Sequence, residues 1–427
     1  PEIVPGLASA LGQGSALVTG TNGKTTTARL LRNMARAGGL QTVANRAGSN
    51  MMRGIAAALV ESSGWNGELA VNANTLGVFE VDEATAPQAA WALRPRAVLF
   101  TNLFRDQLDR YGEVEYVASV WRKAVASWPD LVTLVLNADD PAVASLGESA
   151  KGPVLYYGLE DTSAAVGALE HAADARWCSR CGAELVYADV FYGHLGHWRC
   201  EKCKLARPAV QASCTRVMQD PERLVLTINL PKGRTVSASL PLTGLYNAYN
   251  ALAAAATANV LGLETQAIEE GLATSTAAFG RQERLTVGGR KVQVMLAKNP
   301  AGLNQVIRTI TGNGGSALRL AIFLNDGIAD GRDISWIWDV DFELLQGKTG
   351  SVIVSGTRAW DMALRLKYAG LEPQTTVEPD GAQALRQALR ATPEGETLYV
   401  IPTYTAMLVV RDLLARWGGR SAFWEEE

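Results

Sequence analysis

The sequence predicts an α/β protein built on mainly parallel sheets, and three observations lead to that prediction. A glycine-rich loop at residues 20–26 lies between a short apolar run and a stretch with helical apolar spacing. Strand-like and helix-like segments alternate up to residue 157, as in βαβ units. A fresh alternation of the same kind begins at residue 292. We therefore expect two α/β domains.

The elements of the first domain follow one another in a regular order. Residues 16–19 form an apolar, partly β-branched run, and residues 28–37 have helical spacing before a Gly-Gly stop. Further strands are expected at residues 69–71, 78–81, 97–101, 131–136 and 154–157, with helices at 53–62 and 114–127. Residues 223–230 and 235–240 read as a β-hairpin, and the alanine-rich residues 247–261 as a buried helix.

The character of the chain changes at two places. Residues 171–208 hold four of the five cysteines and all three histidines without a helical period, so we expect an inserted small module. A turn-rich junction near residue 285 precedes the second α/β pattern, which places one domain at residues 1–285 and the other at 286–427. The strands expected in the second domain are residues 292–296, 319–324, 351–355 and 398–401.

Composition excludes several classes of protein. With 427 residues the chain exceeds one domain of about 150 residues. Apolar residues make up 48% and charged residues 19%, which excludes a disordered chain. The net charge of −3 gives no global basic field for nucleic acid. Because no long apolar run and no basic-then-apolar leader is present, we expect a soluble, cytoplasmic protein without a transmembrane segment.

The loop at residues 20–26, called the phosphate loop below, has the composition of a nucleotide site. Glycines allow backbone N–H groups to approach phosphate oxygens at a helix N-terminus, Lys24 can reach the outer phosphates, and the Thr25 hydroxyl can ligate Mg²⁺. The spacing departs from the common pattern because Val18 stands where a first glycine is usual. A ligand-free turn is the alternative. The residues expected to bind ATP are Gly20, Thr21, Asn22, Gly23, Lys24, Thr25 and Thr26.

A magnesium–nucleotide enzyme also needs carboxylates near the phosphates. The strand at residues 78–81 ends beside Glu80 and Glu83, and strand ends of parallel sheets face the ligand. We expect Glu80 to hold Mg²⁺ together with Thr25 and to serve catalysis, with Glu83 as the weaker candidate. Solvated charges at a strand end remain the alternative.

The inserted module carries two C-x-x-C motifs separated by eighteen residues. Each motif offers two thiolates, and together they complete a tetrahedral site for structural zinc. Redox dithiols are the alternative, and His194 or His197 could replace a ligand. Cys214 reads as a buried small residue rather than a nucleophile. The expected zinc ligands are Cys178, Cys181, Cys200 and Cys203.

Four segments together resemble the Mur ligases, a family that includes the folylpolyglutamate synthases. They are the phosphate loop and residues 101–110, 244–250 and 280–284. The resemblance implies that a carboxylate is activated by ATP as an acyl phosphate, which an amine then attacks. It also implies that Asn247 and Asn250 lie at the nucleotide, and that Arg281 contacts the phosphates.

The chain departs from most of that family. Only nineteen residues precede Gly20, so no domain for a UDP group is expected before it. Gln107 stands where a metal-contacting histidine is usual, and residues 296–300 read L-A-K-N-P in place of D-x-A-H-N-P. These departures, the cysteine insert and residues 325–339 are similar to one branch, MurT.

The resemblance to that branch implies a ligase subunit that amidates the α-carboxylate of D-glutamate in the stem peptide of lipid II at the inner face of the membrane. Ammonia would come from glutamine on a GatD-like glutamine amidotransferase partner. The branch also has an aspartate near residues 330–333 that is needed for activity and is associated with the partner's glutaminase site. We favour Asp333, with Asp330 next, against a capped turn with solvated carboxylates.

The residues themselves agree with this division of labour. A glutaminase needs a reactive cysteine with a histidine base, whereas four cysteines here are assigned to metal and Cys214 lacks a Gly-x-Cys-x-Gly elbow. Trp336 and Trp338 alternate as in a strand and read as core or interface residues.

Two other functions stay open at this point. A stand-alone ligase of the same fold would add an amino acid and need no partner. A zinc-ribbon module acting on nucleic acid would use a basic and aromatic strip, against which the overall acidic balance argues. That strip consists of Arg176, Trp177, Arg180, Trp198, Arg199, Lys202, Lys204 and Arg207.

Overall fold

A computed structural model describes residues 2–46, 48–64, 73–106, 114–171, 173–220, 222–276, 280–312 and 317–418. The chain divides into two compact units, residues 1–104 with 113–276 and residues 105–112 with 277–427. The second unit begins before the boundary expected near residue 285, because β12 (Arg281–Val287) pairs with a strand of the second sheet. The strand expected at 69–71 lies outside the described residues.

The first unit is built on a nine-stranded sheet in the order β11-β10-β9-β6-β5-β4-β1-β3-β2. Its strands pair in parallel from β2 to β9, and only the hairpin strands at one edge are antiparallel. The strands are β1 (Ser15–Thr19), β2 (Gln41–Val43), β3 (Thr75–Glu80), β4 (Ala97–Phe100), β5 (Thr133–Asn137), β6 (Val154–Leu159), β9 (Ala212–Gln219), β10 (Leu224–Leu230) and β11 (Arg234–Leu240).

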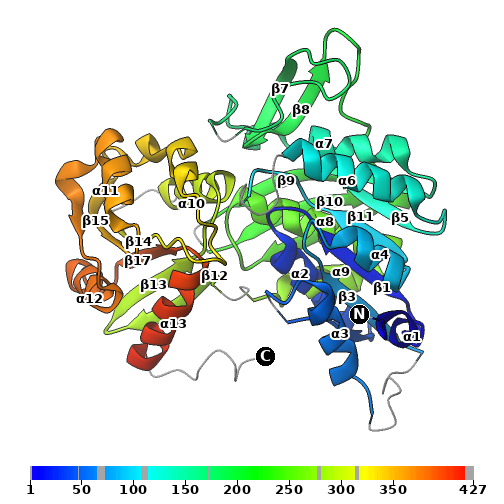
Figure 1. The fold of residues 1–427 in the computed structure, drawn as a ribbon, viewed down its shortest axis with the longest axis horizontal. Coiled ribbons are helices and arrows are strands. Elements are labelled where there is room, and N and C mark those ends of the chain that lie inside the picture. Colours follow the sequence, from blue (N-terminus) through cyan, green and yellow to red (C-terminus); the bar gives the residue numbers. More distant parts are fainter. Residues whose placement is uncertain are drawn as a thin grey trace. The chain divides into compact units, whose positions relative to one another are not determined.

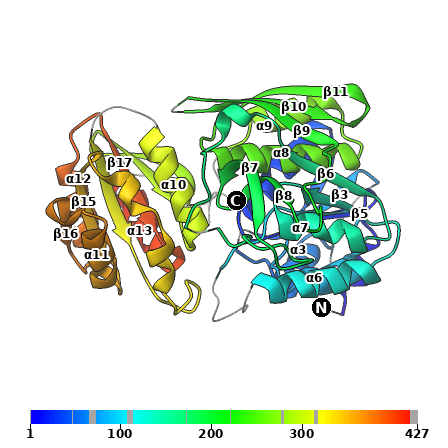
Figure 2. The same cartoon turned by 90° about the horizontal axis from the view of Figure 1, so that it is seen from above.

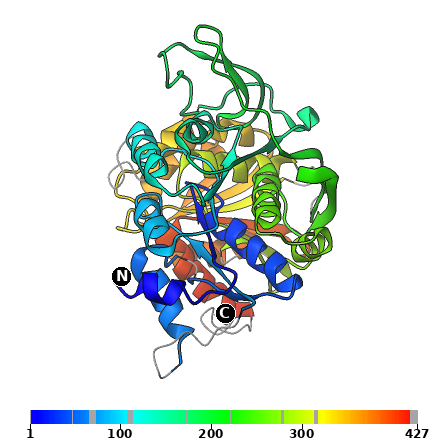
Figure 3. The ribbon, with the colours of Figure 1, turned by 90° about the vertical axis from the view of Figure 1, so that its right-hand side faces the viewer.

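Helices cover both faces of this sheet, and Figure 3 shows the strands between the two helical layers. On one face α2, α8 and α9 contact one another, and on the other α1, α4 and α6 are neighbours. Alanines make up much of the buried surface of α8, which lets it approach α2 and the sheet closely. The helices are α1 (Val4–Ala8), α2 (Lys24–Ala37), α3 (Met52–Glu61), α4 (Ala86–Leu93), α6 (Val114–Ser127), α7 (Pro141–Ala144), α8 (Leu245–Val260) and α9 (Thr265–Ala273).

Most of these elements confirm the sequence predictions. The helix at 114–127 has the predicted bounds, and the hairpin across residues 231–233 is β10 and β11, which lie over α8 and α9 (Figure 2). Strand β1 lies between β3 and β4, so the loops that follow these three strands meet at one edge of the sheet. That edge is where ligands bind in parallel α/β sheets.

The cysteine-rich insert forms a separate two-stranded sheet of β7 (Leu185–Tyr192) and β8 (Leu195–Cys200). Figure 1 shows this hairpin projecting from the first unit above α7. Next to α7, Trp198 packs with Ala144 and two of the cysteines, and its indole N–H donates to the Ala138 carbonyl at 2.9 Å. The insert therefore shares a small core with the parent domain.

The second unit has a six-stranded sheet in the order β12-β13-β17-β14-β15-β16, parallel except at β12. Its strands alternate between two cores, so that Ile322 of β14 faces one and Phe323 the other. Helices α10 and α11 cover one face and α12 and α13 the other (Figure 1). The remaining elements are β13 (Arg290–Met295), β14 (Leu318–Phe323), β15 (Thr349–Ser355), β16 (Thr375–Val377), β17 (Thr397–Pro402), α10 (Pro300–Gly312), α11 (Ala359–Tyr368), α12 (Gly381–Ala391) and α13 (Tyr404–Gly418).

One local prediction in this unit is wrong. The strand-like alternation of Trp336 and Trp338 belongs to a 3₁₀ helix, η4 (Ser335–Asp339). Its buried residue is Ile337, and the Trp338 ring lies 5.6 Å from the Tyr368 ring. In the part of the chain that the structure describes, no helix is both long and apolar enough to cross a membrane.

Candidate active site

The phosphate loop connects the end of β1 with the start of α2, and its two glycines have conformations that other residues avoid. Gly20 has φ +126° and Gly23 has φ +88°. A Cβ on Gly20 would lie 2.2 Å from Thr101 Oγ1, and one on Gly23 would lie 2.1 Å from Asn250 Oδ1. The loop is therefore pressed between two other segments, and side chains at these positions would displace it.

Lys24, the first residue of α2, is buried and folds back over this loop. Its ammonium group donates to the Gly20 carbonyl at 2.5 Å and to the Thr21 carbonyl at 3.1 Å. It also pairs with Glu83 Oε2 at 3.1 Å, with both side chains less than a tenth exposed. This arrangement holds a cation at a helix N-terminus, where backbone N–H groups already favour an anion.

The two carboxylates expected near the metal occupy different positions. Glu80 ends β3 beside Val18 of β1 and is buried, and its backbone N–H and carbonyl are both bonded by the Asn45 side chain. Glu83 lies three residues further along the chain and forms the ion pair with Lys24. The weaker of the two sequence candidates is therefore the one that contacts a residue of the phosphate loop. Asn45 has no motif around it, and sequence reasoning missed it.

Residues 101–104, called the support segment below, follow β4 and hold the phosphate loop in place. Thr101 Oγ1 donates to the Asn22 carbonyl at 2.9 Å, and Asn102 Oδ1 accepts from the Asn22 N–H at 2.8 Å. The Thr21 hydroxyl accepts from the Phe104 N–H at 3.0 Å and donates to the Phe104 carbonyl at 3.1 Å. The first residues of the 101–110 segment, which resembles the Mur ligases, therefore support the loop directly.

The two asparagines of α8 lie behind the same loop. Asn250 Oδ1 accepts from the Thr27 hydroxyl at 3.2 Å, and its amide donates to Asn247 Oδ1 at 3.0 Å. The Asn247 amide in turn donates to the Thr243 carbonyl at 2.8 Å. Both side chains are buried. They form a polar relay from the start of α8 to α2, and Asn250 lies directly against Gly23 of the phosphate loop.

The loop after β14 in the second unit holds both aspartates expected there. Asp330 is buried and caps α13, because its carboxylate accepts from the Thr405 N–H at 2.7 Å and from the Thr405 hydroxyl at 2.5 Å. Asp333 is exposed, and its contact with the Ser335 N–H at 2.8 Å lowers the pKa of its carboxyl. Asp330 is thus a structural cap, whereas Asp333 is exposed.

Other predicted residues of the second unit have varied surroundings. Arg281 begins β12 and is half-buried. Lys298, which replaces the usual histidine of its motif, forms an ion pair with the buried Asp106. Gln107 lies outside the described residues.

The four cysteines of the insert come together as predicted. All four Sγ atoms lie within 4.8 Å of one another, and two pairs are 3.5 Å apart. Tetrahedral zinc with Zn–S bonds of about 2.3 Å needs sulfurs roughly 3.8 Å apart, so the quartet fits the ion. The Cys203 N–H is directed at Cys200 Sγ and lowers the pKa of that thiol, whereas desolvation and the neighbouring thiols raise the pKa of Cys181.

The two C-x-x-C motifs have the same backbone conformation, which explains why each directs both of its thiols to the same side. In each, the residue after the second cysteine donates its N–H to the carbonyl of the first, at 2.8 Å for Gly182 and 3.0 Å for Lys204. Both residues have positive φ, +68° and +61°. The backbone N–H of Cys178 donates to the Ala183 carbonyl, and that of Cys200 donates to the Leu205 carbonyl, both at 2.7 Å. Two similar turns therefore present two thiols each to one point.

The other candidates in and near the insert take structural roles. His194 and His197 bond to carboxylates and backbone groups, and neither belongs to the cysteine cluster. Burial raises the pKa of the Cys214 thiol to about 12, which agrees with its prediction as a buried small residue. Carboxylates neutralise several of the basic residues of the insert, and Trp198 is buried, which weakens the nucleic-acid hypothesis. The pairs are Arg180–Glu148, Arg199–Glu201, Arg207–Asp139 and Arg207–Glu160.

Solved structures share this fold. A pseudomurein peptide ligase type C from Methanothermus fervidus matches with a TM-score of 0.71 and 23% identity, over 96% of this chain and 80% of the other. The folylpolyglutamate synthase of Mycobacterium tuberculosis, solved with ADP and AMPPCP, matches with a TM-score of 0.64 and 16% identity, over 98% and 96%. Both chains carry the Mur ligase architecture.

Sequence comparisons are more specific. Residues 18–180 match the Mur ligase middle domain, and residues 296–407 match the MurT ligase C-terminal family. A relative from Staphylococcus aureus (strain COL), named lipid II isoglutaminyl synthase (glutamine-hydrolyzing) subunit MurT, is 35% identical over 95% of this chain and 88% of its own. A relative of the same name from Streptococcus pneumoniae is 32% identical over 93% and 86%. The chain therefore belongs to the MurT family of Mur ligase-fold enzymes.

Proposed function

We propose that the chain is the ligase subunit of a lipid II isoglutaminyl synthase. It would use ATP to convert the α-carboxylate of D-glutamate in the lipid II stem peptide into the amide of D-isoglutamine. The observation that carries this proposal is the buried Lys24 on a glycine-rich loop, in a chain that aligns with MurT subunits over 95% of its length.

The reaction would begin with phosphoryl transfer. A substrate carboxylate oxygen attacks the γ-phosphorus of ATP, the bond to the β-phosphate breaks, and an acyl phosphate and ADP form. Lys24, with the N–H groups of Gly23 to Thr26, would stabilise the charge on the transferred group, and its pairing with Glu83 keeps the ammonium directed at the loop until a phosphate arrives. Thr21 and Asn22 would act through the loop conformation that the support segment fixes.

Amide formation would follow. Ammonia attacks the acyl carbon, loses a proton, and expels inorganic phosphate, so that nitrogen replaces the oxygen that the phosphate carries away. Asn247 and Asn250 would line the nucleotide side of the site, and Arg281 would contact the phosphates. Asn250, buried against Gly23 and Thr27, supports the first of these assignments.

The fold implies Mg²⁺, and the residues present suit it. The Thr25 hydroxyl of the phosphate loop and the carboxylate of Glu80, at the end of the strand next to β1, would hold the ion, which when bound neutralises phosphate charge. For the cysteine cluster we propose structural zinc, because four thiolates leave no open position for catalysis. One zinc per chain is the expected stoichiometry, measurable by elemental mass spectrometry.

Ammonia would come from a glutamine amidotransferase partner of the GatD type. Among the described residues, four of the five cysteines form the cluster and the fifth is a buried thiol with a raised pKa, so none combines with a histidine as a glutaminase pair. The exposed Asp333 would face that partner's glutaminase site. The complex would work in the cytoplasm at the inner face of the membrane, where lipid II is accessible.

Mass spectrometry of lipid II after incubation with this chain and Mg²⁺–ATP tests the proposal. We expect ammonium to support conversion of the carboxylate to the amide, and glutamine to support it only when the partner is added. Incorporation of a free amino acid, with no formation of the primary amide, would contradict the proposal and establish a stand-alone ligase.

A further inference from the structure

The insert has a second end, remote from the cysteines, that is buried in the first unit. Strands β7 and β8 pair Leu185 with Cys200 at the cysteine end and Tyr192 with Leu195 at the other. The eight residues of β7 separate these ends by roughly 25 Å. We call residues 191–194 the hairpin tip. Phe191 and His194 are fully buried there.

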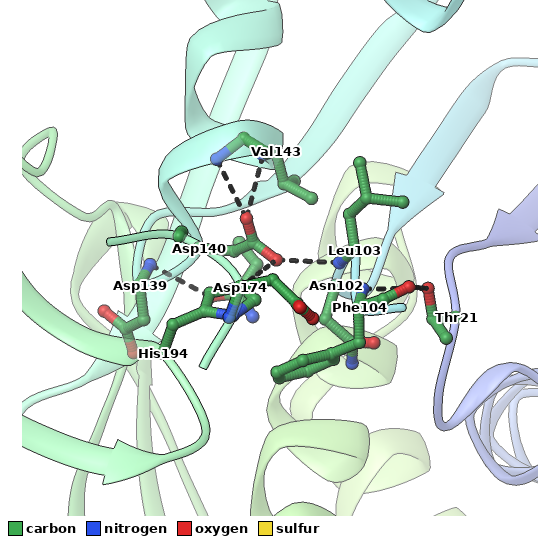
Figure 4. A network of polar contacts seen from close by, with 12 residues as sticks. Thr21, Asn102, Leu103, Phe104, Asp139, Asp140, Val143, Asp174 and His194 are labelled. Atoms are coloured by element: carbon green, nitrogen blue, oxygen red, sulfur yellow. Dashed lines mark hydrogen bonds and ion pairs between the residues drawn. The ribbon is translucent and has the colours of Figure 1, made fainter. Parts of the chain in front are cut away.

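His194 of the tip makes two hydrogen bonds that fix its tautomer. Its Nδ1 accepts from the Asp174 N–H at 3.3 Å, so that nitrogen carries no proton. Its Nε2 therefore carries the proton and donates to Asp140 Oδ2 at 3.3 Å. Both side chains have zero exposed surface. Figure 4 shows the ring between these two partners.

Asp140 collects four donors from three directions. Its Oδ1 accepts from the N–H groups of Ala142 and Val143, which makes it the cap of α7. Its Oδ2 accepts from His194 and from the Leu103 N–H, the latter at 2.7 Å. A buried carboxylate is stable only when its oxygens are satisfied in this way. Removal of one donor therefore affects the others.

Leu103 lies in the support segment between Asn102 and Phe104, two of the residues that hold the phosphate loop. Asn102 Oδ1 accepts from the backbone N–H of Asn22. The backbone N–H of Phe104 donates to the Thr21 hydroxyl (Figure 4). The bond from Leu103 to Asp140 fixes this segment from the opposite side. A continuous set of hydrogen bonds thus leads from the hairpin tip to the phosphate loop.

Aromatic packing runs parallel to these bonds. The Phe104 ring lies 4.3 Å from the His194 ring and 5.8 Å from the Tyr192 ring. Gly193 between them has φ +57°, and a Cβ there would lie 2.5 Å from the Phe104 ring. The tip is therefore shaped to Phe104, the same residue that bonds to Thr21.

The attachment of the insert does not depend on this contact alone. Arg207 pairs with the buried Asp139 at 2.5 Å, which Tyr249 also contacts at 2.6 Å. His197 bonds to the Leu159 carbonyl at 2.8 Å, and Trp198 bonds to Ala138. These anchors lie on the insert and none of their bonds reaches the support segment. The tip contact consequently has a role that simple attachment does not require.

We infer, on the basis of the nucleotide binding proposed above, that the hairpin tip positions the phosphate loop and that His194 is a positioning residue for ATP binding. The insert would act from its tip, through Asp140 and the support segment, while the cysteine cluster stabilises the far end. Changes at the tip would then alter nucleotide affinity without removing any group that touches the nucleotide.

The test compares variants of the full-length chain by calorimetric titration with Mg²⁺–AMPPNP. His194→Phe keeps the ring against Phe104 but removes the proton donor to Asp140, and we expect it to weaken binding about tenfold. His194→Gln restores a donor near the Nε2 position, and we expect affinity close to that of the unmodified chain. His197→Phe, three residues further along the chain in β8, is the matched control and should leave affinity unchanged.

Hydrogen–deuterium exchange gives a readout that does not depend on nucleotide. Faster exchange of residues 19–27 is expected in His194→Phe and not in His197→Phe, because the Thr21 and Asn22 N–H groups bond to Asn102. If His194→Phe does not fold, Asp140→Asn replaces it. Its amide oxygen can still cap α7, while its NH₂ group faces the Leu103 N–H, so it should weaken binding to a similar extent.

The outcomes separate the two claims. If the unmodified chain binds no nucleotide, the proposed function fails and the tip has no ATP site to position. If the unmodified chain binds and His194→Phe or Asp140→Asn binds equally well, the positioning role is wrong and the proposed function stands. Equal weakening by His197→Phe would likewise reduce the effect to general attachment of the insert.

Discussion

Two loops at the carboxyl ends of strands, one in each unit, carry the residues that the sequence singled out. In the phosphate loop the backbone itself provides the chemistry, because Gly20, Gly23 and the start of α2 create a place for an anion. In the loop after β14, two aspartates three residues apart have opposite surroundings, since Asp330 is a buried cap and Asp333 is exposed. A site formed by backbone groups can be inferred from a short sequence motif. The role of a carboxylate cannot be inferred in this way, because it depends on which groups the carboxylate contacts in the fold.

Substitution of Lys24 tests the phosphate loop and should have the largest effect on activity. We expect Lys24→Met to reduce ATP-dependent amide formation by about 100-fold or more, because it removes the cation that stabilises the transferred phosphoryl group. The change also leaves Glu83 buried without its partner, so the double variant Lys24→Met with Glu83→Gln serves to restore folding.

Amide formation measured with ammonium as nitrogen source decides this case. Lys123→Met, an exposed position on α6, is the control and should behave like the unmodified chain. Normal turnover by the folded double variant would contradict the role given to Lys24.

Substitution of the exposed Asp333 tests the loop after β14. Asp333→Ala should lower glutamine-dependent amidation with the partner by about tenfold, the size of effect expected for one lost charged hydrogen bond, and leave ammonium-dependent amidation unchanged. Its melting temperature should change little, because the side chain is exposed and loses only its hydrogen bond to Ser335. Equal loss with both nitrogen sources would place Asp333 in the ligase reaction instead.

Its buried neighbour should show the opposite pattern. Asp330→Ala removes the cap of α13 and should lower the free energy of unfolding by about 1–2 kcal/mol. Chemical denaturation of the two alanine variants side by side measures the difference. A stability loss in Asp333→Ala as large as in Asp330→Ala would show that the two aspartates are not distinguished in this way.

The smallest expected effect concerns Cys214. With a pKa raised to about 12 by burial, its thiol is almost wholly protonated at pH 8, with about one thiolate in ten thousand. Native protein should therefore show no fast reaction of this residue with a thiol reagent, and unfolded protein should show it. Because the raised pKa favours the protonated folded form, this contribution to stability is present below the unfolded pKa and declines as pH rises above it.

Sequence reasoning predicted the parts of the molecule that local signals determine. Such signals mark the strand–loop–helix order around residues 20–26, the 114–127 helix, the 223–240 hairpin and the cysteine quartet. The structure confirms these four local predictions. The strand-like tryptophans failed because alternation over three residues also fits a 3₁₀ turn with one buried residue, Ile337.

Long-range contacts account for what the sequence did not show. Asn45 bonds to a residue 35 positions away, and Asp140 bonds to one 54 positions away. No spacing rule links such pairs, because the sheet order brings them together. The sequence does not distinguish Glu80 from Glu83 for the same reason, because only the fold shows which carboxylate forms the ion pair with Lys24.

The central claim is that the substrate carboxylate is activated by phosphorylation, and isotope transfer tests it most directly. Lipid II labelled with ¹⁸O in the α-carboxylate of D-glutamate is incubated with the chain, Mg²⁺–ATP and ammonium, and the released phosphate is analysed by mass spectrometry. The proposed reaction transfers one ¹⁸O atom to phosphate for each amide formed, with ADP as the other product. Unlabelled phosphate, or AMP in place of ADP, would contradict it.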